Sequence, residues 1–280
     1  MTLKHYIVGD IHGCIKEYLD LESKIMKHAE KSKATPFIVS VGDLVDRGPD
    51  SAAVVAYFRE GYQKKTHAVV MGNHEAEFIL NLIEFSPKIQ SFGFQLPNYI
   101  LGHNADFESE RSQFARNLSL DEYRQLRRLM WIGQGGSTTL RSFNCDPTSP
   151  ATWIIDRQDL EFLINLPLIW ENESAIVTHA LANQNAIQLA QTRDVRTVLT
   201  KDQRKQLFDL MWNRVLPKSR IDKHKVHLSG HTPLLRVKNH KKIGAIQIDT
   251  GCVYGRKLTA YCLETKEYLY VSAAESYAKS

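Results

Sequence analysis

Short apolar runs alternate with amphipathic stretches along the first third of the chain. Strand-like runs of aliphatic residues cover positions 5–8, 37–41 and 66–71. Stretches that repeat apolar residues at helical spacing cover positions 15–31, 51–61 and 74–85. Strands that alternate with helices of this length predict βαβ units and a parallel sheet.

The alternation stops after the third helix. Residues 86–170 are expected to be mostly helical, with the clearest helix at 119–132, and to form a cap-like insertion in a single domain of residues 1–280. Strand character resumes at 174–179, and a long polar stretch up to about Trp212 is typical of helix. Four short strands are expected in the last part of the chain, at 225–230, 244–251, 257–264 and 267–273.

Composition indicates an ordinary globular protein, with 43% hydrophobic and 24% charged residues in a chain of 280. No apolar run approaches the roughly 18 residues of a membrane helix, and the N-terminus lacks the pattern of a secretory leader. Four cysteines stand far apart, without C-x-x-C spacing. We therefore expect reduced thiols, a cytoplasmic protein and no membrane association.

Net charge is a mild +5, from 36 basic and 31 acidic residues. Basic clusters at 124–129 and 237–242 are interpreted as solvated helix faces and turns rather than as a nucleic-acid surface. A basic surface would also suit an acidic or phosphorylated substrate, so charge alone does not decide between these partners.

Three of the early strands end in turns rich in chemistry: GDIHG (9–13), GDLVDRG (42–48) and GNHE (72–75). The polar residues in these turns are Asp10, His12, Asp43, Asp46, Arg47, Asn73, His74 and Glu75. In parallel α/β sheets, ligand sites gather beyond the carboxyl ends of the strands, so the three turns should converge. The glycines that precede each acid or amide leave room for whatever binds there.

Each of these residues has an ordinary explanation when it is taken alone. Asp10 or Asp43 could cap the following helix, His12 could be a hydrogen-bonded buried histidine, and Arg47 could belong to a surface ion pair. Three strand ends that all carry oxygen or nitrogen ligands are improbable as coincident caps. The conjunction therefore favours a site.

Two later histidines share the same placement. His179 ends the strand 174–179, and His231 follows the strand 225–230 in the sequence GHTP. The remaining histidines considered lack this context and are treated as background: His28, His67, His103, His227 and His240.

Carboxylates, imidazoles and one amide suit Mn²⁺, Fe²⁺ or Zn²⁺. Six candidate ligands exceed the needs of one open ion, whereas two ions about 3.5–4 Å apart that share one carboxylate fit better. Asp43, central among the three turns, is the natural bridge.

In this order, GDIHG, GDLVDRG, GNHE, a strand-end histidine and GHTP resemble the PPP family of metallophosphoesterases. The resemblance runs from residue 9 to about 263 and implies a calcineurin-like α/β sandwich, two mixed β-sheets flanked by helices. It also implies two metal ions, with Mn²⁺ expected. By this resemblance, the first ion is held by Asp10, His12 and Asp43, and the second by Asp43, Asn73, His179 and His231.

The chemistry expected of such a site is hydrolysis by a metal-bridging hydroxide. Arg47 can bind two phosphoryl oxygens, and His74 is the candidate general acid. The resemblance assigns Asp46 the orientation of His74 and adds Asn73 to the phosphate side. A second phosphate-binding arginine is expected, and Arg214 is our choice.

The sequence departs from the family pattern at two places. His179-Ala180-Leu181 replaces the usual His-Ala-Gly, which leaves the path of the adjacent loop open. Gln134 stands in the segment 131–143 where bacterial members have asparagine, and it could contact substrate or simply enter a helix. Tyr254 could line the cleft, although ordinary packing is the simpler role.

By resemblance to the protein phosphatases within this family, Asp46 and Glu75 together favour a serine/threonine phosphoprotein phosphatase, with phosphorylated protein as the substrate. The alternative is a symmetrical bis(5'-nucleosyl)-tetraphosphatase, which acts on a phosphate-containing small molecule. A noncatalytic nucleic-acid-binding module has no supporting signature. A metallonuclease is a third alternative, and Asp46 beside Arg47 argues against it. Nothing in the sequence indicates the oligomeric state.

Overall fold

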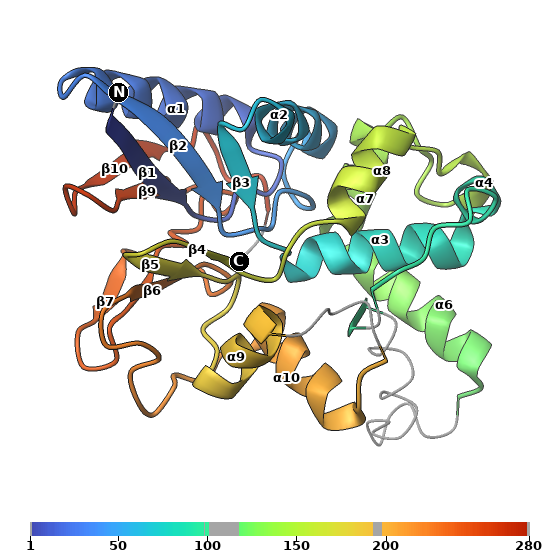
Figure 1. Ribbon diagram of the computed structural model, residues 1–280. Helices are drawn as coiled ribbons and strands as arrows, with labels where there is room; N and C mark the ends of the chain where they lie inside the picture. The colour runs from blue at the N-terminus through green and yellow to red at the C-terminus, as the bar shows by residue number, and fades with distance from the viewer. Residues whose placement is uncertain (1, 98, 101–117, 193–197, 279–280) are drawn as a thin grey trace.

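Two five-stranded β-sheets lie face to face, and helices flank them (Figure 1). The computed structural model describes residues 2–97, 99–100, 118–192 and 198–278. His103 and part of the expected insertion lie outside these residues. The observed architecture confirms the expected α/β sandwich of two mixed sheets.

The first sheet has the strand order β10-β9-β1-β2-β3. Its strands are β1 (Thr2–Val8), β2 (Ala34–Ser40), β3 (His67–Val69), β9 (Lys257–Cys262) and β10 (Tyr268–Ser272). β1, β2 and β3 are parallel, as the alternating pattern predicted. The last two strands of the chain are antiparallel: β9 pairs with β1, and β10 pairs with β9 at the edge of the sheet.

The second sheet has the order β4-β5-β6-β8-β7. Its strands are β4 (Trp170–Glu171), β5 (Ala175–Val177), β6 (Val226–Ser229), β7 (Lys238–His240) and β8 (Ala245–Gln247). Here β5, β6 and β8 are parallel, and β4 and β7 close the two edges antiparallel. Each sheet therefore directs the carboxyl ends of three parallel strands toward the loops that follow them.

An apolar core joins the two sheets. Ile7, Val39 and Val70 of the first sheet pack with Val177 and Leu228 of the second, and all five are at most 3% exposed. Because successive side chains of a strand point to opposite faces, the other face of the first sheet is free to bury itself under helices. A second and larger core cluster forms there.

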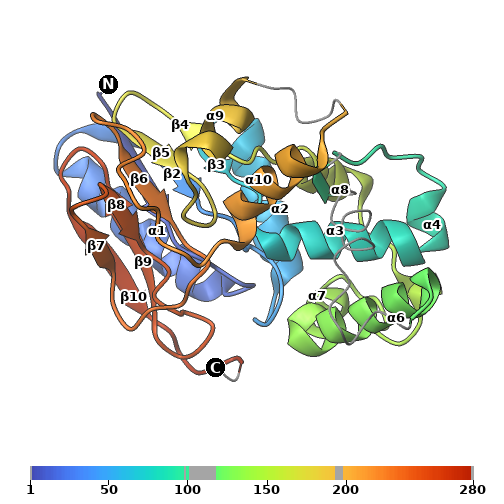
Figure 2. The same cartoon turned by 90° about the horizontal axis from the view of Figure 1, so that it is seen from below.

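Helices α1 (Ile15–Glu30) and α2 (Ser51–Gln63) cover the outer face of the first sheet (Figure 1). The Asp50 side chain caps α2 by accepting a hydrogen bond from the Ala53 amide at 2.9 Å. Two further helices lie against the second sheet's side of the molecule (Figure 2): α9 (Gln184–Thr192) and α10 (Lys201–Trp212). No described helix is long and apolar enough to cross a membrane.

Residues 86–170, which in sequence separate β3 of the first sheet from the strands of the second, are mostly helical in the part that the structure describes, as predicted. Their helices lie beside both sheets in the two views (Figures 1 and 2), next to α3 (Asn73–Phe85). They are α4 (Pro87–Gln90), α6 (Leu120–Trp131), a π-helical turn (Ile132–Gly136), α7 (Ser137–Ser142), a 3-10 turn (Pro150–Thr152) and α8 (Arg157–Ile164).

The interpretation of the basic clusters needs one correction. The cluster at 124–129 lies on α6, but Arg127 is only 7% exposed and forms an ion pair with Glu84 of α3. Arg127 thus attaches α6 to α3 and is not a solvated charge. The other cluster forms β7, an edge strand whose Lys238 and Asn239 are exposed.

Candidate metal centre and active site

Six strand ends, three from each sheet, meet at one buried centre. The residues delivered there are Asp10 after β1, Asp43 after β2, Asn73 after β3, His179 after β5, His231 after β6 and Asp249 after β8. All are at most 6% exposed. Apart from Asp249, these are residues that the sequence placed at strand ends, and the structure brings them together as expected for parallel sheets.

Asp43 stands in the middle of this centre. Its Oδ2 lies 3.4 Å from His12 Nε2, and its Oδ1 lies 3.4 Å from His179 Nε2. Two groups of potential ligands have all their ligand atoms within 4.8 Å of one another, and Asp43 belongs to both. One group adds His12 and His74, and the other adds Asp10 and His179. A carboxylate with an imidazole on each oxygen has the geometry of a bridge.

The composition of these two groups differs from the assignment that the family resemblance implies. The resemblance places Asp10 with His12, whereas the geometry groups Asp10 with His179 and brings His74 close to His12. The rings of His12 and His74 meet edge to face with centroids 4.8 Å apart. In both descriptions, Asp43 is the residue that belongs to both groups, with His12 beside it in one and His179 in the other.

The tautomers of two histidines are set by backbone carbonyls. His12 Nδ1 donates to Val45 O at 2.7 Å, and His179 Nδ1 donates to Val41 O at 2.7 Å. Both rings therefore direct Nε2 toward Asp43. His12 Nε2 accepts a hydrogen bond from Arg47 Nη1 at 2.6 Å, so it carries the lone pair that a metal ligand needs.

Asn73 and His231 complete the centre on the side of the second sheet. Asn73 Oδ1 lies 2.9 Å from His179 Nε2 and 3.0 Å from His231 Nδ1. His231 Nε2 is buried and has no protein partner among the described residues. The His231 amide donates to the Asp10 carboxylate at 3.0 Å, which ties the two sheets together at this point.

The buried carboxylates of the centre lie close together, an arrangement that a bound cation would stabilise. Burial raises the pKa of Asp10 well above its usual value, and the nearby Asp249 reinforces the effect. Burial, together with the nearby Asp43 charge, also raises the pKa of Asp249 to about 6. Burial opposes ionisation of Asp43 as well, but His179 and His74 hold the pKa of Asp43 well below its usual range. Three crowded carboxylates with oxygen and imidazole neighbours fit divalent ions, which would favour ionisation of all three.

The histidines respond to the same charges. Burial tends to lower the pKa of His179, but the Asp43 carboxylate outweighs it and raises that pKa to about 10. Burial and the positive charge of His179 lower the pKa of His231 to about 3, so His231 is a neutral imidazole. Burial and Arg47 likewise lower the pKa of His12. His231 and His12 are therefore in the neutral form that binds metals, whereas His179 would have to release a proton when an ion binds.

Glu75 holds the loop that carries Asp43 and does not face the centre's ligands. Its Oε2 accepts hydrogen bonds from the amides of Asp43 (2.8 Å) and Gly72 (3.0 Å). Its Oε1 accepts from the amides of Leu44 (2.6 Å) and Val45 (3.2 Å). Glu75 is fully buried, so its role is to fix the backbone, and it has no contact with solvent or substrate.

Close backbone approach explains one of the predicted glycines. A Cβ on Gly72 would lie 2.3 Å from Asp43 Oδ1, a distance that no side chain tolerates. The chain is also strained around the centre, because five of its non-glycine residues adopt positive φ: His12, Asp43, Asp46, Arg47 and His231. Such strain persists only where the surrounding structure enforces it, and it clusters at functional sites.

His74 and Asp46 form a buried pair beside the centre. His74 Nδ1 donates to Asp46 Oδ2 at 2.6 Å. Asp46 has no exposed surface and also accepts hydrogen bonds from Trp131 Nε1 (2.9 Å) and Thr139 Oγ1 (2.7 Å). With Nδ1 held in this way, Nε2 is the nitrogen of His74 that can exchange a proton with a substrate. Trp131 and Thr139 lie in the segment 131–143 that contains Gln134, but nothing in the sequence predicted their contact with Asp46.

A hollow of about 520 Å³ opens beside Arg47. The π-helical turn forms one side of it, and Gln134 is among its lining residues. Glycine is required at position 135 for the π-helical turn to pack against Arg47. Its φ is +119°, and a Cβ there would lie 2.5 Å from the Arg47 amide nitrogen. The Arg47 guanidinium lies over the ring of Tyr254, 5.8 Å from its centroid.

Arg214 follows α10 and is exposed, and its positive charge helps to lower the pKa of His231.

The loop after His179 needs no glycine, because Leu181 is buried and its φ is not among the positive values. Ala180 N donates to Leu210 O at 2.8 Å, which fixes this loop on α10. Asp249 was missed by the sequence analysis, although it follows β8 in the same strand-end position as the other acids.

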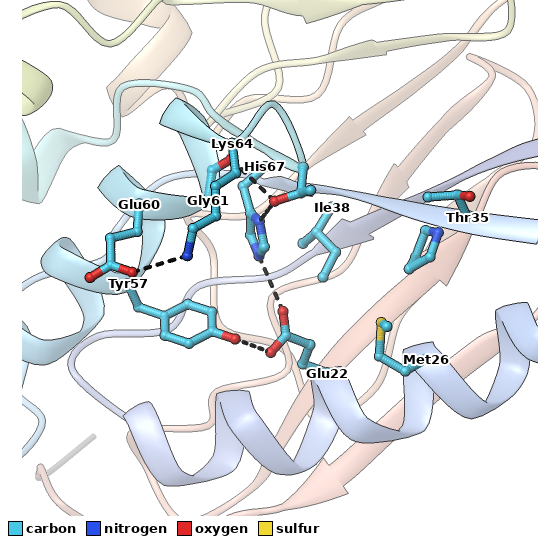
Figure 3. A pocket seen from close by; sticks show the side chains of 11 residues that line it. Glu22, Met26, Thr35, Ile38, Tyr57, Glu60, Gly61, Lys64 and His67 are labelled. Carbon is cyan, nitrogen blue, oxygen red and sulfur yellow. Dashed lines mark hydrogen bonds and ion pairs between the residues drawn. The ribbon is translucent and has the colours of Figure 1, made fainter.

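A second hollow, of about 290 Å³, lies at the amino ends of β2 and β3, away from the centre (Figure 3). Tyr57 and His67 both point at the Glu22 carboxylate; His67 Nε2 is 3.3 Å from Glu22 Oε1. Both Glu22 oxygens thus have protein partners. This network ties α1 to α2 and β3, and agrees with the assignment of His67 to the background.

Comparison with known proteins identifies the family. The model of the calcineurin-like phosphoesterase family matches residues 3–262. An asymmetrical bis(5'-nucleosyl)-tetraphosphatase, PrpE of Oceanobacillus iheyensis, is 27% identical over 98% of this chain and 94% of its own length. Serine/threonine-protein phosphatase 1 of Salmonella typhimurium is 42% identical, but over 25% of this chain and 29% of its own.

A crystal structure of a protein assigned provisionally as a diadenosine tetraphosphatase has the same fold. It superposes with a TM-score of 0.54, at 19% identity, over 96% of this chain and 93% of the other. The strand-end ligands, the sandwich of two mixed sheets and the match over residues 3–262 all agree. The chain belongs to the calcineurin-like phosphoesterase family.

Proposed function

We propose that this chain hydrolyses bis(5'-nucleosyl) tetraphosphates with the help of two divalent metal ions. The observation that carries the proposal is the 520 Å³ hollow beside Arg47, which has the size of a pocket for a nucleotide-sized ligand. The similarity to the PrpE tetraphosphatase supports it, because it spans 98% of the chain, whereas the similarity to protein phosphatase 1 spans 25%.

The proposed ligands of the first ion are Asp10, His12 and Asp43, and those of the second are Asp43, Asn73, His179 and His231. Mn²⁺ is the expected ion, with Fe²⁺ or Zn²⁺ as alternatives. When bound, the two ions would lower the pKa of a water molecule between them and so supply the nucleophile near neutral pH. The buried Nε2 of His231, which has no partner within the described part of the chain, and the crowded carboxylates fit this requirement.

Phosphate binding and proton transfer are the proposed functions of the chain's own side chains. Arg47 binds phosphoryl oxygens and neutralises the charge that spreads over them in the transition state. Asn73 and Arg214 are the proposed additional contacts on the phosphate side. His74 can hold a proton at Nε2 for a leaving oxygen that requires one, and Asp46 orients the ring through Nδ1.

A serine/threonine phosphoprotein phosphatase is the second candidate, and the His74–Asp46 pair favours it. A seryl or threonyl alkoxide is a poor leaving group and needs a general acid, whereas a nucleotide leaves readily without one. By family resemblance, Glu75 also favoured this candidate. Because Glu75 only holds backbone amides, its identity bears on the loop and not on the substrate.

Parallel assays test the proposed function. Mn²⁺-loaded protein would be given diadenosine tetraphosphate and a phosphoserine peptide under the same conditions, and kcat/KM would be compared. The proposal predicts at least tenfold higher kcat/KM for the dinucleotide, and product analysis would show whether cleavage is symmetrical. A tenfold preference for the peptide would overturn the proposal in favour of the second candidate.

We also propose that the enzyme works in the cytoplasm. All four cysteines are buried and free, as expected where thiols stay reduced. Cell fractionation of the native organism would test this assignment.

A further inference from the structure

Three segments that are distant in sequence build the hollow beside Arg47. They are the π-helical turn with the start of α7, the loop after β8, and the last described residues of the chain. Its lining includes Arg47, Gln134, Ser137, Thr138, Tyr254 and Tyr277. Neither the sequence analysis nor the family resemblance singled out Tyr277, which stands more than 200 residues from Arg47.

The segment that carries Tyr277 is firmly attached. Buried Glu17, on the first turn of α1, accepts hydrogen bonds at Oε1 from the Ala274 amide (3.0 Å) and from the Tyr277 hydroxyl (2.8 Å). The Tyr277 amide donates to Val253 O at 2.9 Å, and Tyr254 pairs with Ser276 in an isolated bridge. The segment therefore forms a defined wall of the hollow.

The chemistry of the lining is specific. Two phenol rings, two hydroxyls, one amide and one guanidinium line the hollow, and its described lining includes no carboxylate. The absence of acids and the presence of Arg47 suit a ligand that carries phosphate. The rings of Tyr254 and Tyr277 offer aromatic surface to a flat group, and stacking on an aromatic side chain strengthens binding by roughly five- to 150-fold per base.

We propose that the hollow binds the nucleoside end of the substrate, and that Tyr277, held in place by Glu17, contacts the base. This inference rests on the proposed function as a nucleotide-directed hydrolase. It makes Tyr277 a specificity-determining residue and Glu17 its positioning residue. A phosphate of the substrate would lie at Arg47 while the base lies against the C-terminal wall.

The test uses two ligands that differ only in the base. AMP and ribose 5-phosphate share the phosphate and the sugar, so the ratio of their dissociation constants, measured by calorimetry on Mn²⁺-loaded protein, reports recognition of adenine. The wild-type chain should bind AMP at least fivefold more tightly. Tyr277→Ala should bring the ratio close to one by weakening AMP alone.

Two further variants separate the ring from its anchor and from general effects. Tyr277→Phe keeps the ring but loses the bond to Glu17, so it should retain more than half of the wild-type ratio. Tyr270→Ala removes an exposed tyrosine of β10 that does not line the hollow, and it should leave the ratio unchanged. Circular dichroism would confirm that each variant is folded.

Equal affinities for AMP and ribose 5-phosphate in the wild-type chain would overturn the inference. So would equal weakening of both ligands in Tyr277→Ala. If Tyr277→Ala instead weakened a phosphoserine peptide and left AMP unaffected, the hollow would be a peptide site. These binding results are independent of diadenosine tetraphosphate hydrolysis, so failure of the inference and failure of the proposed function can be told apart.

Discussion

Replacing His74 by asparagine separates the two candidate functions and tests the role of the buried pair. The substitution removes the proton donor at Nε2 and the 2.6 Å hydrogen bond to the buried Asp46 carboxylate, which orients the ring. General acid catalysis contributes about 10²- to 10⁴-fold, or roughly 3–5 kcal/mol of barrier, where the leaving group is poor. A seryl alkoxide needs that proton, whereas p-nitrophenolate and a nucleotide do not.

The assay compares kcat for a phosphoserine peptide, p-nitrophenyl phosphate and diadenosine tetraphosphate in wild-type and His74→Asn protein. We expect a loss of about 10²- to 10⁴-fold for the peptide and of less than about tenfold for the other two. His224→Asn, at an exposed histidine, is the control. An equal loss on all three substrates would refute the general-acid role. Loss of bound metal in His74→Asn would show that His74 is a ligand, as its grouping with His12 and Asp43 allows.

Three further substitutions test phosphate binding, the loop that carries Asp43, and a buried histidine outside the site. Arg47→Ala should raise the inhibition constant of inorganic phosphate by about tenfold or more, since hydrogen bonds to charged groups contribute about 1.5–3 kcal/mol; an unchanged constant would contradict phosphate binding by Arg47. Glu75→Gln should lower the free energy of unfolding in urea by roughly 3–6 kcal/mol, because an amide cannot accept from all four backbone donors, whereas the exposed Glu60→Gln should change it little. Burial lowers the pKa of His227 to about 3, so below about pH 6.5 the unfolded chain takes up a proton that the folded chain does not. Between pH 7 and 5, that difference should cost the wild type about 2 kcal/mol of stability, and His227→Gln should show a correspondingly smaller loss; equal losses would contradict it.

Local pattern predicted much of the fold. The alternating apolar runs gave β1, β2 and β3 in parallel order, and the strand-like runs near the end of the chain became β6, β8, β9 and β10. These features are readable because period and polarity are local properties. Which strands become neighbours is not local: β9 pairs with β1 across more than 240 residues, and no pattern within either strand specifies the partner.

The residues of the candidate site that directly follow strands could also be predicted from the sequence. The rule that placed Asp10 and Asp43 could have found Asp249, which follows β8 in the sequence IDTG. Trp131 and Tyr277 could not be found in this way. Trp131 contacts Asp46 across 85 residues of sequence, and Tyr277 is held at the hollow by Glu17 and by the Val253 carbonyl. Both depend on packing between distant segments.

The central claim is that Asp43 bridges two divalent ions at the meeting point of the two sheets. The most direct measurement is the metal content of protein dialysed after loading with Mn²⁺, determined by elemental analysis for the wild type, for Asp43→Asn and for the exposed control Asp20→Asn. The account predicts two ions per chain in the wild type and the control, and loss of both in folded Asp43→Asn. Two ions retained without the Asp43 carboxylate, or none bound by the wild type, would contradict it.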